Sequence, residues 1–191
     1  MVPFPEILKV LHGLDESFSE ALVVQESKRS SLMWIEYFMS GVPWLIGSSL
    51  ALVCSVSGKW SMEAQHQLVV LNIGLLTDLC VVGVIKLTVQ RRRPIYNIDD
   101  QVLEAPIFDE FSFPSGHSAR AAMLATICGA FMPKYRVAVG GIAVLVAVSR
   151  VAMGRHYCSD VMGGVALGWL DGMAVLTLPV SFTGWVAKLF G

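Results

Sequence analysis

The succession of apolar segments constrains this chain more than any single motif does. Five segments are apolar enough to form membrane helices, and they cover residues 32–56, 68–89, 119–132, 137–151 and 159–180. A helix needs about 20 mainly apolar residues to cross the hydrocarbon core of a bilayer. With 54% hydrophobic residues, 15% charged residues and a mean hydropathy of +0.62, the chain is too apolar for an ordinary soluble domain of 191 residues. The sequence therefore predicts an all-α polytopic membrane bundle of about five transmembrane helices, formed by residues 31–191.

The first 30 residues follow a different pattern. Between residues 4 and 24, apolar residues recur at roughly helical spacing and charged residues stand between them. This pattern predicts an N-terminal amphipathic or interfacial segment over residues 1–30, although a flexible amphipathic terminus fits it equally well. The chain starts without a basic region, so no cleavable signal peptide is expected.

Three clusters of polar residues interrupt the apolar segments. They cover residues 86–94, 112–118 and 149–160. Counting five crossings places all three clusters on the same face of the membrane. Unrelated flanking charges would have no reason to bring two histidines, an aspartate and several cations together, so this convergence predicts a functional site.

The last of these clusters contains a histidine and an aspartate four residues apart. If a helix has begun by His156, this side chain and that of Asp160 share a helix face, and the carboxylate can accept a proton from one ring nitrogen. The other ring nitrogen is then free to act as a base or a nucleophile. Arg150, six residues earlier, favours an anionic target. A polar cap on a membrane helix is the plain structural alternative for this cluster taken alone.

The middle cluster, Pro114-Ser115-Gly116-His117, precedes an alanine-rich segment. Such residues predict a helix start, where unpaired backbone N–H groups bind phosphate well. His117 stands at this terminus and can protonate a leaving group there. Arg120, one turn further along, either reaches the same anion or extends toward the interface.

The first cluster supplies further cations. Lys86 and Arg93 are seven residues apart, about two helical turns, and project toward one side if the helix continues that far. Because Pro94 disfavours helix at the residue before it, Arg93 is expected in the following loop. A positive-inside flank explains this cluster equally simply.

Two features inside the predicted spans are interpreted as structural. A carboxylate is costly in a membrane, so we expect Asp78 and Asp171 to make polar contacts between helices. Gly164, Gly168 and Gly172 recur at four-residue steps and form a small-residue stripe that is typical of close helix packing.

Together, the cations and the helix N–H groups suit a multiply charged anion. In phosphoryl transfer they would stabilise charge on the equatorial oxygens while one histidine attacks and the other protonates the departing oxygen. No cofactor and no metal are expected, because the fixed cations would do the work of a metal ion. The four cysteines form no Cys-x-x-Cys pair and are expected to be small core residues, and a net charge of −1 gives no reason to expect nucleic acid.

The three clusters resemble the complete signature of the type-2 phosphatidic acid phosphatase family, also called the lipid phosphate phosphatases. The matching blocks are Lys86-x6-Arg93-Pro94, Pro114-Ser115-Gly116-His117 and Ser149-Arg150-x5-His156-x3-Asp160. Residues 91–97 and 111–117 are similar to one branch, the polyisoprenoid diphosphate phosphatases typified by presqualene diphosphate phosphatase. This resemblance covers roughly residues 41–168.

The resemblance implies a role for each matching residue. His156 would be the nucleophile that forms a phosphohistidine, Asp160 would orient it, and His117 would be the general acid and then the base for water. The residues implied to bind the substrate phosphate are Lys86, Arg93, Ser115, Gly116 and Arg150. The implied fold is a helical core like that of acid phosphatases and vanadium haloperoxidases.

We therefore predict a metal-independent membrane phosphohydrolase that acts on isoprenoid diphosphates and monophosphates, such as presqualene, farnesyl and geranylgeranyl diphosphate. Arg91 and Arg92 would assist a second phosphate, or serve as membrane flanks.

A phosphatase acting mainly on phosphatidic acid, lysophosphatidic acid or sphingosine phosphate is the alternative within the class. A non-catalytic phosphate-binding membrane scaffold is the alternative from another class. A serine hydrolase using Ser115 and His117 has little support, because the Gly-x-Ser-x-Gly elbow is lacking. The expected partners are the lipid substrate and the bilayer, and a homo-oligomer is left open.

The placement of basic residues predicts the orientation in the membrane. Of the 14 lysines and arginines, ten fall on the face of the three clusters and four on the opposite face. Without Lys86, Arg93 and Arg150, whose charges catalysis explains, seven remain against four. The positive-inside rule then favours a cytoplasmic catalytic face. The expected location is the endoplasmic reticulum or nuclear envelope, and a lumenal site would follow if the N-terminal segment also crosses.

Overall fold

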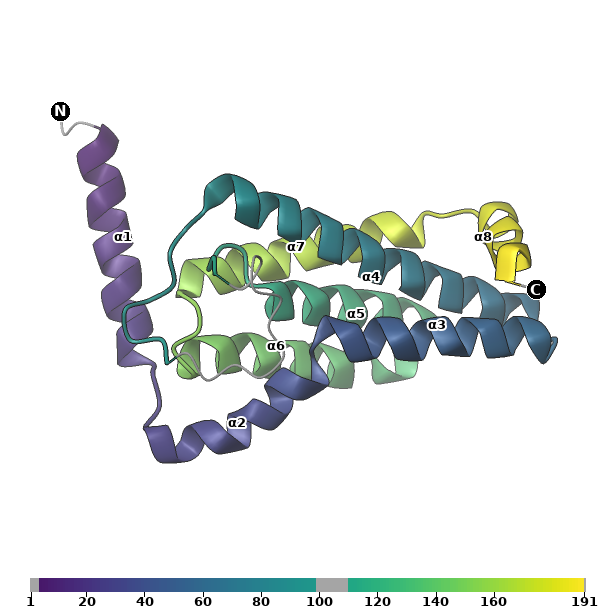
Figure 1. Ribbon diagram of the computed structural model, residues 1–191, viewed down its shortest axis with the longest axis horizontal. Helices are drawn as coiled ribbons and strands as arrows, with labels where there is room; N and C mark the ends of the chain where they lie inside the picture. The colour runs from purple at the N-terminus through teal and green to yellow at the C-terminus, as the bar shows by residue number, and fades with distance from the viewer. Residues whose placement is uncertain (1–3, 99–109, 191) are drawn as a thin grey trace.

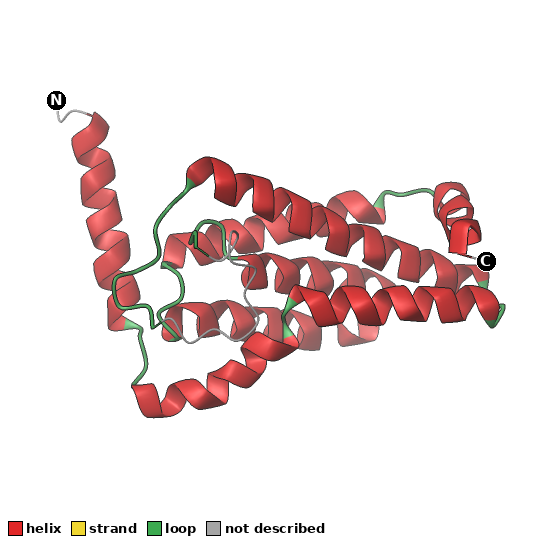
Figure 2. Ribbon diagram, in the orientation of Figure 1, coloured by secondary structure: helices red, strands yellow, loops and turns green. Residues whose placement is uncertain are grey.

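A computed structural model describes residues 4–98 and 110–190 of the chain, and for residues 4, 5 and 26–28 it describes the backbone alone. Over these ranges the secondary structure is helical, with no strand beyond one isolated bridge between Arg92 and Phe111 (Figure 2). The helices are α1 (Phe4–Ala21), α2 (Glu26–Phe38), α3 (Gly41–Ser57), α4 (Met62–Val89), α5 (Gly116–Phe131), α6 (Arg136–Ala152), α7 (Cys158–Leu176) and α8 (Val180–Ala187), with short 3₁₀ turns at Pro133–Tyr135 and Lys188–Phe190. The prediction of an all-helical bundle is confirmed.

Helix α5 forms the centre of the bundle. It contacts α4, α6 and α7, and its small and aliphatic side chains are buried on most sides. Met123 and Ile127 are almost fully buried there, against Leu75 of α4 and Val175 of α7. With 16 residues, α5 is shorter than a typical membrane-spanning helix. Because α5 is surrounded by other helices, it can be short and rich in small alanine side chains.

The outward faces of the bundle are apolar. Leu76 and Val84 on α4 and Val144 on α6 are each more than half exposed. Such side chains are expected where the surrounding solvent is lipid. Three helical segments of the described chain are long and apolar enough to cross a membrane, namely Arg29–Ser57, Met62–Val89 and Pro133–Ala152, and α7 with α8 would be a fourth if that pair, bent by 88°, is one span.

The first predicted span is two helices. Helix α2 ends at Phe38, α3 begins at Gly41, and the two residues between them are not helical. A proline inside a helix usually kinks it, but Pro43 lies in the first turn of α3, where a proline is well tolerated because that N–H group needs no helical partner. The break therefore precedes the proline.

The glycine stripe on α7 packs directly against α5, as predicted. A Cβ atom at Gly168 would lie 1.8 Å from the carbonyl oxygen of Ala119, and one at Gly164 would lie 2.5 Å from the carbonyl oxygen of Ser115. At Gly172 the nearest atom would be the Cβ atom of Thr126, 2.7 Å away. No side chain larger than hydrogen fits at these positions while the two backbones keep this separation.

The membrane carboxylates join helices, also as predicted. Asp78 of α4 forms an ion pair of 3.0 Å with Arg120 of α5, and Arg120 also donates to the carbonyl oxygen of Met39 at 3.0 Å. Asp171 of α7 accepts a hydrogen bond of 2.7 Å from Thr77 of α4. Arg120 is therefore held by the bundle, and it neither extends to the interface nor serves as a phosphate ligand.

The cysteines depart from expectation in part. All four are free thiols, and Cys128 and Cys158 are partly buried, but Cys54 and Cys80 are exposed on the outer surface of the bundle. The prediction that all four are core residues is wrong for these two. A thiol is apolar enough to face lipid, which explains its place on that surface.

The end of the bundle opposite the C-terminus carries the polar clusters. The C-terminal ends of α4 and α6 and the N-terminal ends of α5 and α7 meet there, and α1 lies across this end (Figure 1). The prediction that the three clusters converge is thus confirmed. The acidic loop noted between residues 95 and 113 falls mostly within residues 99–109, outside the described residues.

Candidate active site

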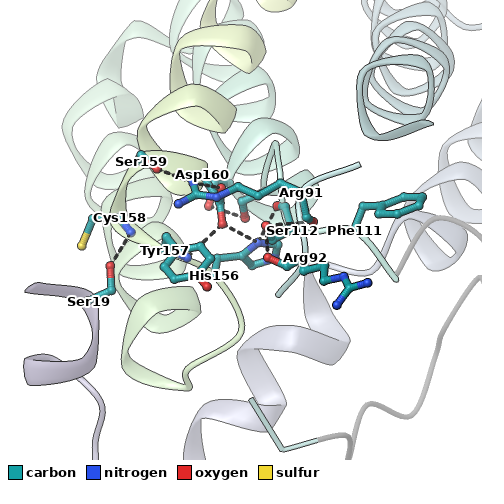
Figure 3. A network of polar contacts seen from close by, with 12 residues as sticks. Ser19, Arg91, Arg92, Phe111, Ser112, His156, Tyr157, Cys158, Ser159 and Asp160 are labelled. Carbon is teal, nitrogen blue, oxygen red and sulfur yellow. Dashed lines mark hydrogen bonds and ion pairs between the residues drawn. The ribbon is translucent and has the colours of Figure 1, made fainter. Parts of the chain in front are cut away.

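His156 lies in the short loop between α6 and α7 and is 2% exposed. The chain turns at Gly154, whose φ of +70° is a left-handed conformation that favours glycine. The ring Nδ1 of His156 donates a hydrogen bond of 2.8 Å to the backbone carbonyl of Ser112 (Figure 3). With its proton on Nδ1, a neutral imidazole keeps the lone pair of Nε2 for attack on an electrophile.

The contacts of the Asp160 carboxylate differ from those that the sequence predicted. Helix α7 begins at Cys158, two residues after His156, so the expectation that His156 and Asp160 share one helix face is wrong. The Asp160 carboxylate lies 3.8 Å from Nδ1 of His156. Its closer partners are the backbone N–H group of Tyr157, at 2.9 Å, and the guanidinium of Arg91, at 2.7 Å. The carboxylate is buried, and it fixes the loop that carries His156.

Three cations surround His156 as the sequence predicted. Burial, and then the positive charges of Arg93, Arg150 and Lys86, hold the pKa of His156 well below its ordinary value of 6.5. Lys86 and Arg150 are themselves buried, at 4% and 1% exposure, and Lys86 donates to the backbone carbonyl of Phe111 at 2.9 Å. The imidazole is therefore neutral near pH 7, as a nucleophile must be. Arg93 lies beyond the end of α4, in the loop where Pro94 predicts it.

The N-terminus of α5 contributes the second histidine. The ring of His117 lies near the backbone of Glu36, and its Nε2 atom is buried without a hydrogen-bond partner. A buried polar atom without a partner is uncommon in a folded protein and marks a place for a ligand group. Arg150 and His156 lie within electrostatic reach of His117. The two histidines thus lie in one region, and Nδ1 of His156 is bonded to a main-chain carbonyl.

Ser115 and Gly116 make unequal contributions to an anion site. Ser115 is fully buried at the N-cap, where its Oγ pairs with that of Ser118 at 2.9 Å and its N–H group donates to the carbonyl of Asp160 at 3.1 Å. This N–H group is thus already engaged. Gly116, His117 and Ser118 form the first turn of α5, where N–H groups have no acceptor within the helix. The phosphate-binding prediction therefore fits the Gly116 turn better than the Ser115 backbone.

Glu36 of α2 belongs to this site, and sequence reasoning missed it. Its two carboxylate oxygens pair with the Nη2 atoms of Arg150, at 3.2 Å, and of Arg155, at 3.3 Å. Arg155 is 1% exposed and also donates to the carbonyl of Ile98. The only sequence signal was the presence of a carboxylate at the start of an apolar segment, where a charge is costly unless it is paired.

The guanidinium of Arg91 is likewise bonded to other side chains of the protein. Its Nη1 atom contacts Asp160 at 2.7 Å and Ser159 at 2.6 Å, its Nη2 atom contacts Asp15 at 2.8 Å, and its guanidinium lies 4.1 Å from the ring centre of Tyr157. It therefore ties the carboxylate of Asp160 to α1, while the neighbouring Arg92 is exposed. The sequence suggested a second phosphate for this pair, which the contacts of Arg91 do not favour.

The fold and the site define a class of protein. Two histidines, a cluster of cations and a helix N-terminus converge at one end of an apolar helical bundle, and this arrangement is suited to transferring a phosphoryl group from a membrane substrate. The chain belongs to the PAP2 superfamily, whose family model matches residues 67–183. Relatives of this chain are named phosphatases, and the chain is a hydrolytic enzyme of the membrane.

Individual relatives agree with this assignment. Phosphatidylglycerophosphatase B of Bacillus subtilis (strain 168) is 31% identical over 176 residues, which are 84% of this chain and 80% of the relative. The "Probable lipid phosphate phosphatase beta" of Arabidopsis thaliana is 33% identical over 150 residues, which are 64% of this chain and 70% of the relative. The crystal structure of a transmembrane PAP2 type phosphatidylglycerolphosphate phosphatase from Bacillus subtilis has a TM-score of 0.66 and 27% identity, over 87% of this chain and 85% of that one.

Proposed function

We propose that this enzyme hydrolyses lipid phosphates through a phosphohistidine formed on His156. The observation that carries the proposal is the state of the two histidines: Nδ1 of His156 donates to a main-chain carbonyl, which leaves its Nε2 free to attack, and the nearby His117 has a buried Nε2 atom without a hydrogen-bond partner. Binding alone would need the cations, but it would not need a neutral imidazole prepared for attack.

The reaction has two steps. In the first, the bound phosphate monoester gives its proton to Nε2 of His117, Nε2 of His156 attacks phosphorus, the bond to the lipid oxygen breaks, and His117 passes that proton to the departing oxygen. In the second, His117 takes a proton from water, the water oxygen attacks the phosphohistidine, and the bond to nitrogen breaks to release phosphate. Lys86, Arg93, Arg150 and the Gly116 turn stabilise charge on the phosphoryl oxygens in both steps.

The head group of the lipid substrate is a more specific part of the proposal. The sequence around Arg91 and Pro94 resembles the isoprenoid diphosphate branch, which favours farnesyl or presqualene diphosphate. The relatives carry names that refer to phosphatidylglycerophosphate and to lipid phosphates, which are phosphomonoesters. Because Arg91 is bound to Asp15 and Asp160, a monoester fits the available cations as well as a diphosphate does. We keep isoprenoid diphosphates as the first candidate and glycerolipid monoesters such as phosphatidic acid as the second.

The cellular setting is part of the same proposal. The excess of basic residues on the catalytic face supports a cytoplasmic orientation. With isoprenoid or glycerolipid substrates, the endoplasmic reticulum or the nuclear envelope is the membrane that we propose. Glycosylation-site tagging of the N-terminus and of the loop after α5 would report the orientation directly.

The test is phosphate release in detergent with EDTA present, from farnesyl diphosphate, phosphatidic acid and phosphatidylglycerophosphate. We expect His156→Ala to lose more than about 10³-fold of the activity. A rapid quench into base with radiolabelled substrate should trap label on wild-type protein and none on the His156 variant. His117→Ala should retain the label for longer, because hydrolysis of the intermediate has lost its base.

His66 offers a matched control. This histidine lies at the other end of the bundle, where its Nδ1 contacts the hydroxyl of Thr183 at 2.7 Å. His66→Ala should therefore keep activity close to wild type once protein amounts are normalised. Loss of activity in the folded His156 variant without any trapped label in wild type would refute the covalent mechanism. Folded wild-type protein that is inactive on all three substrates would favour the scaffold alternative.

A further inference from the structure

Helix α1 turns apolar side chains outward and covers polar ones, which is the opposite of a helix on a water-exposed surface. Val10, Leu14 and Phe18 are 61%, 63% and 64% exposed, whereas Ser19 is fully buried and Asp15 is largely covered. A helix on a soluble protein normally turns its apolar stripe toward the protein. The outward apolar stripe of α1 therefore lacks a partner within the described chain.

The position of α1 identifies what covers this stripe. The helix lies across the polar end of the bundle, and its N-terminal half extends past the side of α4 and α7 (Figure 1). The helices of the bundle run through the bilayer, so a helix lying across their ends is at the level of the lipid head groups. Among the described residues, α1 is not one of the segments apolar enough to span a membrane, because charged residues interrupt it. These features are typical of a helix that lies in the membrane interface.

The polar flank of α1 closes the start of α7. Asp15 accepts a hydrogen bond of 3.1 Å from the backbone N–H group of Ser159 and another from its hydroxyl. Ser19 accepts a hydrogen bond of 2.8 Å from the backbone N–H group of Cys158. These N–H groups belong to the first turn of α7, where no acceptor is available within the helix. Helix α1 thus caps α7 from outside, one residue before Asp160.

The contacts continue into the site and along the chain. Asp15 also binds Arg91, and Arg91 binds Asp160. After α1, the N–H group of Val24 donates to the carbonyl of Ala152 at 2.9 Å, close to the C-terminal end of α6, which carries Arg150. The N-terminal segment therefore holds the ends of both helices that flank the His156 loop.

We propose that α1 is a lipid-surface helix that assembles the active site: its apolar stripe lies in the bilayer interface while Asp15 and Ser19 hold the start of α7 and the Arg91–Asp160 pair. Membrane contact at one side of α1 is thus coupled to the position of the His156 loop at the other. Asp15 and Ser19 are positioning residues in this arrangement, since they act through α7 and Arg91. The coupling to catalysis rests on the function proposed above, whereas the location of α1 does not.

The location is tested with nanodiscs that contain brominated lipids. Phe18→Trp should add fluorescence that these lipids quench strongly, whereas Glu20→Trp, at an exposed position on the other side of the helix, should add fluorescence that they quench weakly. Equal quenching of the two added tryptophans would overturn the interfacial placement. Because bromine quenches tryptophan only at short range, strong quenching at Phe18 would show that lipid, and not a protein partner, covers the stripe.

The coupling is tested with two charge-matched variants. Leu14→Glu with Phe18→Glu places two negative charges on the stripe, and Lys9→Glu changes the charge by the same amount at an exposed position on the opposite side of the helix. We expect the first variant to lower kcat about tenfold in nanodiscs of zwitterionic lipid and the second to leave kcat within about twofold. Equal effects of the two variants would overturn the coupling.

Asp15→Asn combined with Ser19→Ala probes the polar flank. We expect a fall in kcat of about 10-fold or more, with KM little changed, because the residues that hold the site are displaced and the phosphate ligands remain. Hydrogen exchange should accelerate at the amides of Cys158 and Ser159, and Asp15→Glu should partly rescue both readouts. Unchanged exchange at these amides would refute the capping role, and this measurement stands even if the wild-type enzyme proves inactive on every substrate tried.

Discussion

The closest backbone approach in the bundle supports a quantitative prediction about Gly168. A Cβ atom added there would lie 1.8 Å from the carbonyl oxygen of Ala119, whereas real Cβ atoms essentially never approach within 3.0 Å. Gly168→Ala must therefore move α7 and α5 apart by at least 1.2 Å, the difference between these two distances. The obstacle is main chain on a central helix, so no side-chain rotation can relieve it.

This displacement should lower both the stability and the activity of the enzyme. Overpacking of a tight interface typically costs about 1–3 kcal/mol, and a misplacement of about 1 Å at a catalytic group can lower the rate about 10²-fold. Helices α5 and α7 carry His117 and Asp160 in their first turns, so their separation alters the site directly. We expect Gly168→Ala to lose about 10²-fold in kcat/KM and several degrees in Tm.

The assay is phosphate release together with thermal unfolding in the same detergent. Gly141→Ala is the control, because a Cβ atom at Gly141 of α6 meets nothing within 4 Å and alanine favours helix by about 0.5–1 kcal/mol. Gly164→Ala, with a predicted approach of 2.5 Å to the carbonyl of Ser115, should give an intermediate loss. If Gly168→Ala and Gly141→Ala had the same activity and Tm, the account of helix packing as the support of the site would be refuted.

Three further predictions concern charges. Glu36→Gln should raise KM by about 10-fold or more, because the carboxylate that holds Arg150 in place is lost. Initial rates measured over a range of monoester concentrations check this, and an unchanged KM would contradict it. Because burial and nearby cations lower the pKa of His156, the unfolded chain binds a proton that the folded chain does not. The stability that His156 contributes relative to His156→Gln should therefore be constant above pH 6.5 and fall by up to about 1.4 kcal/mol per pH unit below it, as Tm measured across pH would show. Asp78→Ala should cost about 3–5 kcal/mol by leaving Arg120 buried without its carboxylate, while Asp78→Leu with Arg120→Met should restore most of the loss in thermal unfolding.

The sequence predicted those parts of the fold that follow from local pattern. Apolar segments indicated the helices, and counting them indicated that Lys86, His117, Arg150 and His156 meet at one end of the bundle. The glycine stripe indicated a close helix contact because only a missing side chain permits one. The helices and the glycine stripe follow from residue type and spacing within a single helix, and the meeting of the clusters follows from the alternating direction of successive helices.

The remaining features depend on contacts between distant residues. Glu36 lies more than 110 positions before Arg150, and nothing near it in sequence identifies its partner. Ser112 holds His156 through a main-chain carbonyl, which every residue possesses and which no sequence pattern can reveal. Asp15 lies in a segment that the sequence describes only as amphipathic, and its capping role appears only when α1 meets the end of α7.

The placement of the carboxylates explains how this site can bind an anion and still keep a neutral nucleophile. A carboxylate bonded directly to Nδ1 would favour the protonated imidazole and raise its pKa, which would lower the fraction of His156 that has a free Nε2 lone pair at a given pH. Here a neutral carbonyl accepts the Nδ1 proton of His156, and Asp160 remains 3.8 Å away with its charge directed to Arg91. Glu36 likewise directs its carboxylate to Arg150 and Arg155 and not to His117. The acidic groups thereby hold the cations in place without bonding to either histidine, and each histidine keeps an Nε2 atom for the phosphoryl group.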